Sequence, residues 1–311
     1  MTPKNRMHQR RLAIAMFQLF FLLSSMAYSQ SGANHAAKTQ IVLLGTGHPV
    51  PDPDRSGPAT AIIVNGTPYL IDFGAGVVRR AAAAAYFKGV KALQPSNMKI
   101  VFVTHLHADH TVGYPDLIYA RSQQLDVYGP TGIRAMTEHV MEAYRVDREA
   151  KMRAIKTLGT GAVLTQVNAH EISAGVVYKD ANVTVTAFPT KHDFVESYGY
   201  RFDTPDRSIV ITGDTTPTSA TIDACHGCDV LIHEVYSEAG AKTSPNFQKF
   251  APTYHTSTTQ LAELATKAKP GLLILYHLGT FRIPSTCEDL EKEMRQAYKG
   301  RFVCGSDLDI Y

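Results

Sequence analysis

The chain has 311 residues, of which 44% are hydrophobic, and its 31 Lys and Arg stand against 28 Asp and Glu. Four of the basic residues lie among the first 29, which contain no acidic residue, so the remaining chain has 27 basic and 28 acidic residues. Nucleic-acid binding usually needs a clustered basic face, and this balance argues against one. The apolar content suits one large layered domain, expected over residues 40–311.

The first 29 residues resemble a secretory signal peptide. Basic residues precede an apolar stretch over residues 12–27, and Ala27-Tyr28-Ser29 offers small residues at the cleavage positions. We therefore expect a signal peptide over residues 1–29, a flexible segment over residues 30–39 and a periplasmic or secreted protein. An uncleaved anchor is the alternative, but the apolar stretch is short for a spanning helix. After cleavage no stable membrane span is expected.

Apolar runs separated by Gly, Pro or Asn turns predict a series of strands. They lie near Gln40, Ala61, Tyr69, Lys99, Leu125, Val183, Tyr200, Ser208, Val230 and Leu272. Alanine content and apolar spacing predict helices over residues 77–91, 133–144, 258–267 and 285–298. Residues 129–168 lack the strand rhythm, so we expect a helical insertion there that covers the candidate site. A surface decoration is the alternative.

The most informative segment is residues 105–110, which reads His-Leu-His-Ala-Asp-His directly after a predicted strand. Imidazole suits zinc, copper, iron or nickel, and a carboxylate adds a hard oxygen donor. His105, His107, Asp109 and His110 therefore form a candidate site for a divalent transition metal. A histidine-rich surface loop is the alternative.

Three later predicted strands each end in another residue of the same ligand types. These residues are His192, Asp214 (after Gly213) and His277. A single His or Asp in such a place is more often structural, but three repetitions favour a shared site on loops at the strand ends. His170 and His226 are possible substitutes for His192.

Taken together, these segments resemble the metal-binding motifs of the metallo-β-lactamase superfamily, in the branch that contains ribonuclease Z and secreted arylsulfatase-like hydrolases. The resemblance runs from about residue 41 to the C-terminus and includes residues 43–49 and 69–76. It implies an α/β fold, the four-layer αββα sandwich of that family, with the helical insertion added. It also favours His192 as the third histidine motif, because residues 198–201 resemble the strand that follows this motif in the branch.

The resemblance further implies two divalent metal ions, Zn²⁺ in the first place and Mn²⁺ as the alternative. One ion would bind His105, His107 and His192, the second would bind Asp109, His110 and His277, and Asp214 would bridge both. Asp72 would accept hydrogen bonds behind the ligands and fix their orientation. A water shared by two ions would be largely hydroxide near neutral pH, because one zinc alone lowers its pKa to about 7. This is hydrolysis chemistry.

Two short motifs, at residues 231–234 and 255–258, resemble those that ribonuclease Z and its relatives use beside the metals. In that setting His255 would donate a proton to the departing oxygen, and Glu234 would orient a neighbour. Asp109 is expected to serve catalysis as well as metal binding. For His233 and Glu234, capping a buried strand end is an equally good interpretation.

The expected substrate also follows from the resemblance. Exported members of the branch that are similar in residues 113–118, 127–130 and 231–236 are associated with arylsulfatase activity. An aryl sulfate ester is therefore expected, with phosphodiesters, lactones and other small esters as alternatives, and a metal-binding protein without catalysis as a different class. Tyr119, Tyr144 and Tyr254 could contact an aryl group.

Three observations argue against transfer-RNA processing. Export and the near-neutral charge are two of them; the third is that only 21 residues separate His192 from Asp214, where ribonuclease Z carries a long substrate-gripping arm. The basic residues Arg145, Arg148, Lys151, Arg153 and Lys156 are interpreted as a solvated helix face. The expected partner is therefore a small-molecule ester and not a nucleic acid, and a homodimer is compatible with the sequence.

Four cysteines fit an oxidising compartment. Cys225 and Cys228 have redox-type spacing but do not open a helix, so they are interpreted as a structural or incidental pair. Cys287 and Cys304 flank the last predicted helix and could be linked. The sequence leaves both pairings open.

Overall fold

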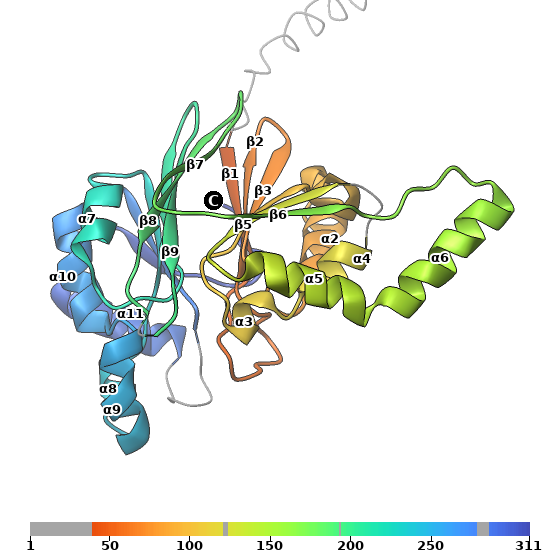
Figure 1. Ribbon diagram of the computed structural model, residues 1–311. Helices are drawn as coiled ribbons and strands as arrows, with labels where there is room; N and C mark the ends of the chain where they lie inside the picture. Colours follow the sequence, from red (N-terminus) through yellow and green to blue (C-terminus); the bar gives the residue numbers. More distant parts are fainter. Residues whose placement is uncertain (1–38, 121–123, 193, 279–285) are drawn as a thin grey trace, which may run out of the picture. The chain divides into compact units, whose positions relative to one another are not determined.

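The computed structural model describes residues 39–311 except 121–123, 193 and 279–285. The predicted signal peptide, and the predicted flexible segment up to residue 38, lie outside the described residues. Two mixed sheets form the centre of the domain (Figure 1). Among the described helices, none combines the length and apolarity that a membrane crossing requires.

The first sheet has the strand order β1-β2-β3-β4-β5-β6, and the second has the order β13-β12-β11-β10-β9-β8-β7. The strands of the first are β1 (Thr39–Gly45), β2 (Ala59–Val64), β3 (Thr67–Ile71), β4 (Ile100–Phe102), β5 (Leu125–Gly129) and β6 (Val167–Glu171). Those of the second are β7 (Gly175–Lys179), β8 (Thr184–Pro189), β9 (Tyr198–Asp203), β10 (Ser208–Ile211), β11 (Val230–Glu234), β12 (Leu272–Tyr276) and β13 (Phe302–Cys304).

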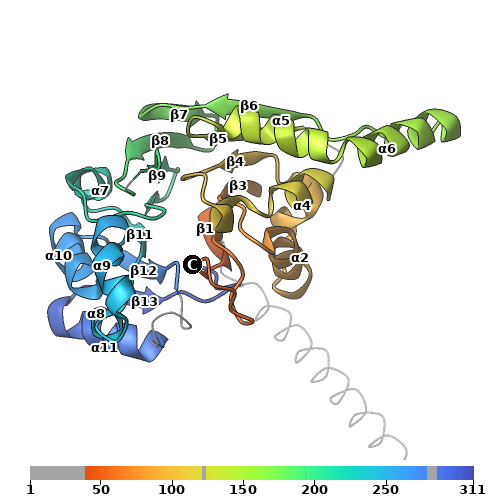
Figure 2. The ribbon, with the colours of Figure 1, turned by 60° about the horizontal axis from the view of Figure 1, so that its bottom comes forward.

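Several of the helices cover the outer faces of the two sheets (Figures 1 and 2). The first half of the chain contributes α2 (Val77–Phe87), α3 (Ala108–Thr111), α4 (Tyr114–Tyr119), α5 (Ile133–Ala143) and α6 (Arg145–Leu158), with the short 3₁₀ turns η1 (Lys91–Leu93) and η2 (Pro95–Asn97). The second half contributes α7 (Ser219–Cys225), α8 (Glu238–Ala241), α9 (Pro245–Tyr254), α10 (Thr258–Ala268) and α11 (Cys287–Ala297).

Three apolar cores separate the four layers. The central core lies between the sheets; a second lies under α2, α4 and α5, and a third under α7, α10 and α11. Strand β1 shows how the sequence specifies this arrangement. Its residues alternate, with Ile41 and Leu43 in the central core and Val42 and Leu44 against the helices. Because successive side chains of a strand point to opposite faces, a strand that is apolar throughout is buried on both. The predicted four-layer sandwich is confirmed.

All ten predicted strands are present, and β6, β7 and β13 were missed. Strands β6 and β7 lie at the edges of their sheets and have no fully buried residue, so they lack the apolar runs that predict strands. The four predicted helices correspond to α2, α5, α10 and α11. Helix α2 ends at Phe87, earlier than predicted, just before Gly89, whose positive φ of 74° suits a helix end.

The helical insertion consists of α5 and α6, but only its beginning lies near the candidate site. A Cβ placed on Gly132, just before α5, would lie 3.1 Å from Leu106 Cδ1. Helix α6 has no buried residue, and both ribbon views show it extending away from the sheets (Figures 1 and 2). The prediction that the insertion covers the site is therefore wrong for α6, because a helix with so polar a composition gains little by packing on the domain.

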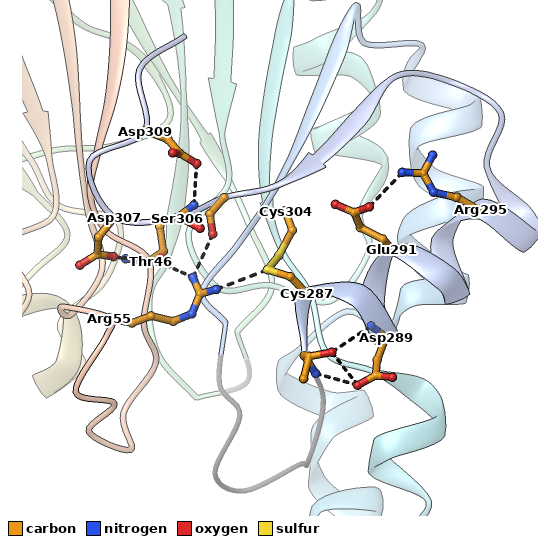
Figure 3. Close-up of a disulfide and its surroundings, with 12 residues drawn as sticks. Thr46, Arg55, Cys287, Asp289, Glu291, Arg295, Cys304, Ser306, Asp307 and Asp309 are labelled. Carbon is orange, nitrogen blue, oxygen red and sulfur yellow. Dashed lines mark hydrogen bonds and ion pairs between the residues drawn. A yellow bond between two sulfur atoms is a disulfide. The ribbon is translucent and has the colours of Figure 1, made fainter.

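Two disulfides, Cys225–Cys228 and Cys287–Cys304, pair the four cysteines. The second joins the start of α11 to the end of β13 (Figure 3). Arg55 lies beside it: Nη1 donates to Thr46 Oγ1 at 2.7 Å and to the Gly305 carbonyl at 2.9 Å. The disulfide therefore joins α11 to β13, and Arg55 ties this C-terminal part to the loop that follows β1.

Replacing both Cys287 and Cys304 with Ser is expected to lower the free energy of unfolding by about 3 kcal/mol, because the bridge restricts the unfolded chain over a separation of 17 residues. Urea denaturation in oxidising buffer measures the difference. In strong reductant the variant and the wild type should unfold together. Equal stability in oxidising buffer would contradict the expectation.

Candidate metal centre

The candidate residues lie at the carboxyl ends of strands from both sheets. Strands β3, β4 and β5 run parallel in the first sheet, as do β10, β11 and β12 in the second. Parallel strands end at a common edge, so the segments that follow them can meet there. The first sheet delivers the His105–His110 segment, and the second delivers His192, Asp214 and His277 after β8, β10 and β12.

The first group consists of His105, His107 and His192. The Nδ1 atom of His107 lies 3.1 Å from His105 Nε2 and 3.0 Å from His192 Nε2. The other nitrogen of His192 donates to the Tyr254 carbonyl at 2.9 Å, which leaves its Nε2 lone pair directed at the group. A tetrahedral ion with metal–nitrogen bonds of about 2.0–2.1 Å holds its ligand atoms roughly 3.4 Å apart, so this trio has nearly the required spacing.

The second group consists of Asp109, His110, Asp214 and His277. His277 Nε2 lies 3.1 Å from Asp109 Oδ2 and 3.3 Å from Asp214 Oδ2, and His110 Nε2 lies 3.4 Å from Asp214 Oδ1. Within the described residues, His110 Nε2 and Asp214 Oδ1 are both buried without a hydrogen-bond partner. Two such atoms facing each other are costly unless a cation lies between them. The donor set therefore fits a divalent metal.

Asp214 lies between the two groups. Its Oδ2 is 3.9 Å from His192 Nε2 in the first group, while Oδ1 faces His110 in the second. The preceding Gly213 has φ 63°, and a Cβ there would lie 2.6 Å from the Thr104 Cβ. Only glycine fits this turn. The Gly-Asp pair thus allows β10 to end close against the first sheet and to place Asp214 between the groups.

Asp72 orients ligands of both groups from behind. It accepts hydrogen bonds from His110 Nδ1 at 2.8 Å and from the Thr104 hydroxyl at 2.9 Å. That hydroxyl in turn lies 3.0 Å from His105 Nδ1, where it can accept the ring proton. Asp72 therefore fixes His110 directly and His105 through Thr104, which leaves each Nε2 free for a metal.

Replacing Asp72 with Asn is expected to weaken the binding of both ions by roughly 10- to 100-fold, because the amide is uncharged and has one accepting oxygen, so it cannot keep the bonds from His110 Nδ1, the Thr104 hydroxyl and the Thr104 N–H together. Zinc titration against a chelator measures the two dissociation constants. Thr104→Val breaks only the link to His105, so it should weaken one ion and spare the other. Loss of a single ion in Asp72→Asn would show that Asp72 supports one group only.

Charge in the centre also favours cations. Burial lowers the pKa of His105, His107 and His192, so these rings are neutral near pH 7. Although burial opposes it, neighbouring histidines lower the pKa of Asp214 well below its usual value, and this carboxylate is ionised. The first group thus offers neutral ring nitrogens beside an ionised carboxylate, a combination that attracts a divalent ion. Although burial opposes it, the carboxylates of Asp214, Asp72 and Asp109 raise the pKa of His110 well above its usual value, so this ring must release a proton when an ion binds.

His255 and Glu234 form a pair at the edge of the centre. His255 Nδ1 lies 3.1 Å from Glu234 Oε1 and 4.0 Å from Asp214 Oδ2. Burial lowers the pKa of His255, but the Glu234 carboxylate outweighs burial and raises it to about 9. Glu234 also accepts from the backbone N–H of Thr215 at 3.0 Å. The pair is thus held rigidly beside Asp214, with Nε2 as the nitrogen that can release a proton.

The seven candidate ligands and the candidate pair His255–Glu234 come together in one place. The substitutes for His192 do not: His170 stacks on Tyr128 of β5, and His226 lies exposed at the end of α7. Tyr119 and Tyr144 contact each other, at the ends of α4 and α5, whereas Tyr254 lies against His192.

One histidine beside the centre was missed as a site residue. The ring of His48 lies 6.4 Å from that of His277, and its Nε2 is buried without a hydrogen-bond partner among the described residues. His48 stands alone in sequence after a glycine-rich turn, so only its position in the fold links it to the other histidines.

Comparison with known proteins places this centre in a family. A model for the beta-lactamase superfamily domain matches residues 67–278. The protein named ribonuclease Z from Mycobacterium bovis (strain BCG / Pasteur 1173P2) is 31% identical over 279 residues, which cover 86% of this chain and 96% of that protein. The chain belongs to the β-lactamase superfamily, as a metallo-hydrolase of the branch that contains ribonuclease Z.

Solved structures show the same fold. The metallo-beta-lactamase fold protein YhfI from Bacillus subtilis has a TM-score of 0.65 at 18% identity, over 88% of this chain and 99% of that one. Human tRNase Z, short form, has a TM-score of 0.60 at 21% identity, over 88% of this chain and 98% of that one. The fold normally binds divalent metal ions, commonly zinc, in agreement with the His and Asp groups described above.

These relatives overturn the expected partner. A small-molecule ester with no nucleic acid is wrong as an expectation, because relatives named ribonuclease Z match almost end to end. The near-neutral total charge was a poor guide, since phosphates can be bound locally by metal ions without a basic surface.

Proposed function

We propose that this protein is a phosphodiesterase that cleaves RNA with two divalent metal ions, and that it acts in the periplasm or outside the cell. The proposal depends on one observation, the His255–Glu234 pair beside Asp214. The names of the relatives add RNA as the substrate class.

The His255–Glu234 pair favours a phosphodiester substrate because of the chemistry of the leaving group. Cleavage of an RNA phosphodiester expels a sugar alkoxide, a strong base that must be protonated as the bond breaks. An aryl sulfate expels a phenolate, which is stable without a proton. A histidine held by a buried carboxylate at the edge of a metal centre therefore suits the phosphodiester better than the sulfate ester.

The residues of the candidate metal centre have distinct roles in the proposed hydrolysis. Two bound divalent ions would supply a water of lowered pKa and neutralise charge on the phosphate. His105, His107 and His192 would hold one ion and Asp109, His110 and His277 the other, with Asp214 shared. His255 donates its Nε2 proton to the departing oxygen, while Glu234 keeps the ring oriented through Nδ1. The substrate approaches where His107, Asp109 and His255 are only partly buried.

Export is part of the proposal and is supported by the disulfides. Both cysteine pairs are bridged, as expected for a protein of an oxidising compartment. Cell fractionation with mass measurement of the mature chain tests this part. A reduced, full-length protein in the cytoplasm would overturn it.

The activity is tested with zinc- or manganese-loaded protein on a short RNA, bis(4-nitrophenyl) phosphate and 4-nitrophenyl sulfate. We expect both phosphodiesters to be cleaved and the sulfate ester to react far more slowly. Asp214→Asn serves as the inactive control. Turnover of the sulfate ester alone would refute the proposal and support the arylsulfatase expected from the sequence.

A further inference from the structure

Helix α9 carries an aromatic face that leads to the metal centre. Phe247, Phe250 and Tyr254 are spaced so that they share one side of the helix. The ring centroids of Phe247 and Phe250 are 5.0 Å apart, and those of Phe250 and Tyr254 are 5.9 Å apart. We refer to these three side chains as the aromatic face.

The aromatic face is continuous with the catalytic residues. The Tyr254 ring lies 5.6 Å from the His192 ring, and the Tyr254 carbonyl accepts from His192 Nδ1. The next residue in the chain is His255. A planar group lying on this face would therefore be adjacent to the bond that His255 helps to break.

The aromatic face lies outside the apolar cores, although Phe247 also packs edge-on against Tyr236 with ring centroids 5.3 Å apart. Its three residues are half-buried, belong to none of the three apolar cores, and lie on a helix whose only buried residue is Ala251. A further aromatic residue, Phe194, follows His192 by two residues and is 91% exposed. Partly exposed aromatic side chains beside a reactive centre are typical of a binding surface.

We propose that the aromatic face is a stacking subsite for the nucleobase next to the scissile phosphodiester. This inference rests on the proposed function and specifies how the substrate is held. Metal ions bind the phosphate, and the rings bind the base through its π-face, which all four bases share, so the subsite tolerates any sequence. Edge-to-face contacts among the rings hold the aromatic face in place before the substrate binds.

The test compares two ligands that differ in the base: adenosine 5′-monophosphate and ribose 5-phosphate. Calorimetry on the metal-loaded full chain should show roughly tenfold tighter binding of the nucleotide, the size expected for one base on an aromatic ring. Phe250→Leu and Tyr254→Leu should remove most of this preference and leave ribose 5-phosphate binding within about twofold. Tyr254→Phe should keep the preference, because it keeps the ring.

Phe87→Leu is the matched control, since Phe87 is a surface aromatic on α2 that is 84% exposed. It should change neither dissociation constant. Equal affinity of the wild type for the two ligands, or a preference unchanged in both leucine variants, would overturn the subsite. Because binding is measured at equilibrium, a protein without phosphodiesterase activity that still prefers the nucleotide through α9 would refute the proposed function and keep the subsite.

Discussion

Replacing Asp214 with Asn is expected to remove both metal ions and to lower phosphodiester hydrolysis at least about 10³-fold. The Oδ1 atom of Asp214 lies 3.4 Å from His110 Nε2 in the second group, and its Oδ2 atom lies 3.3 Å from His277 Nε2 in that group and 3.9 Å from His192 Nε2 in the first. The amide keeps the shape of the side chain but not its charge, so neither ion keeps its shared ligand. Metal analysis by mass spectrometry, with initial rates on bis(4-nitrophenyl) phosphate, measures both effects.

Asp203→Asn provides the control, because Asp203 is a surface carboxylate at the end of β9 with 46% of its side chain exposed. It should bind two ions and keep full activity. Circular dichroism of both variants verifies that the fold is intact. If Asp214→Asn still held two ions and hydrolysed the substrate within about tenfold of the wild type, the bridging role would be wrong.

Replacing His255 with Ala is expected to lower the rate of cleavage by an amount that depends on the leaving group of the substrate. On RNA, whose leaving oxygen needs a proton, the rate should fall by about 10²- to 10⁴-fold. On bis(4-nitrophenyl) phosphate, whose leaving group needs no proton, the loss should stay below about tenfold. Glu234→Gln should show the same pattern in weaker form, since Glu234 acts through His255.

His170→Ala is the matched control for this substitution. His170 lies on β6 against Tyr128, and its loss should leave both rates unchanged. An equal fall of His255→Ala on the two substrates would mean that His255 positions the metal ions or the substrate and does not donate a proton.

The sequence predicted the central strands well because of where they lie. Runs such as Leu272–Tyr276 in β12 are buried on both faces and stay apolar throughout, whereas edge strands such as β6 mix polar and apolar residues. The candidate ligands were also found from sequence, since His105 to His110 are contiguous and the others follow recognisable strands. Patterns of this kind lie within short segments, so they can be recognised from the sequence without knowledge of the fold.

Other features depended on contacts between distant segments. Thr104 connects Asp72 to His105 only because β3 and β4 pair, and a threonine before a histidine carries no signal of that role. Helix α9 was not predicted, and of its aromatic residues only Tyr254 was named as a possible contact; the fold shows its position, because the Tyr254 carbonyl accepts from His192 Nδ1. The near-neutral total charge gave the wrong prediction about nucleic acid, because a total does not show where in the fold the charged groups lie.

The origin of the ligands has a consequence for stability. Each proposed ion takes ligands from both sheets: His105 and His107 with His192 in one case, Asp109 and His110 with His277 in the other. Each ion is therefore a cross-link between the two halves of the sandwich, and its binding free energy adds to that of folding. At a metal concentration 100 times the dissociation constant, one site contributes about 2.7 kcal/mol. Chelation should lower the melting temperature, with the two sheets separating first. When metal is scarce, the enzyme would therefore lose stability of its fold as well as catalytic rate.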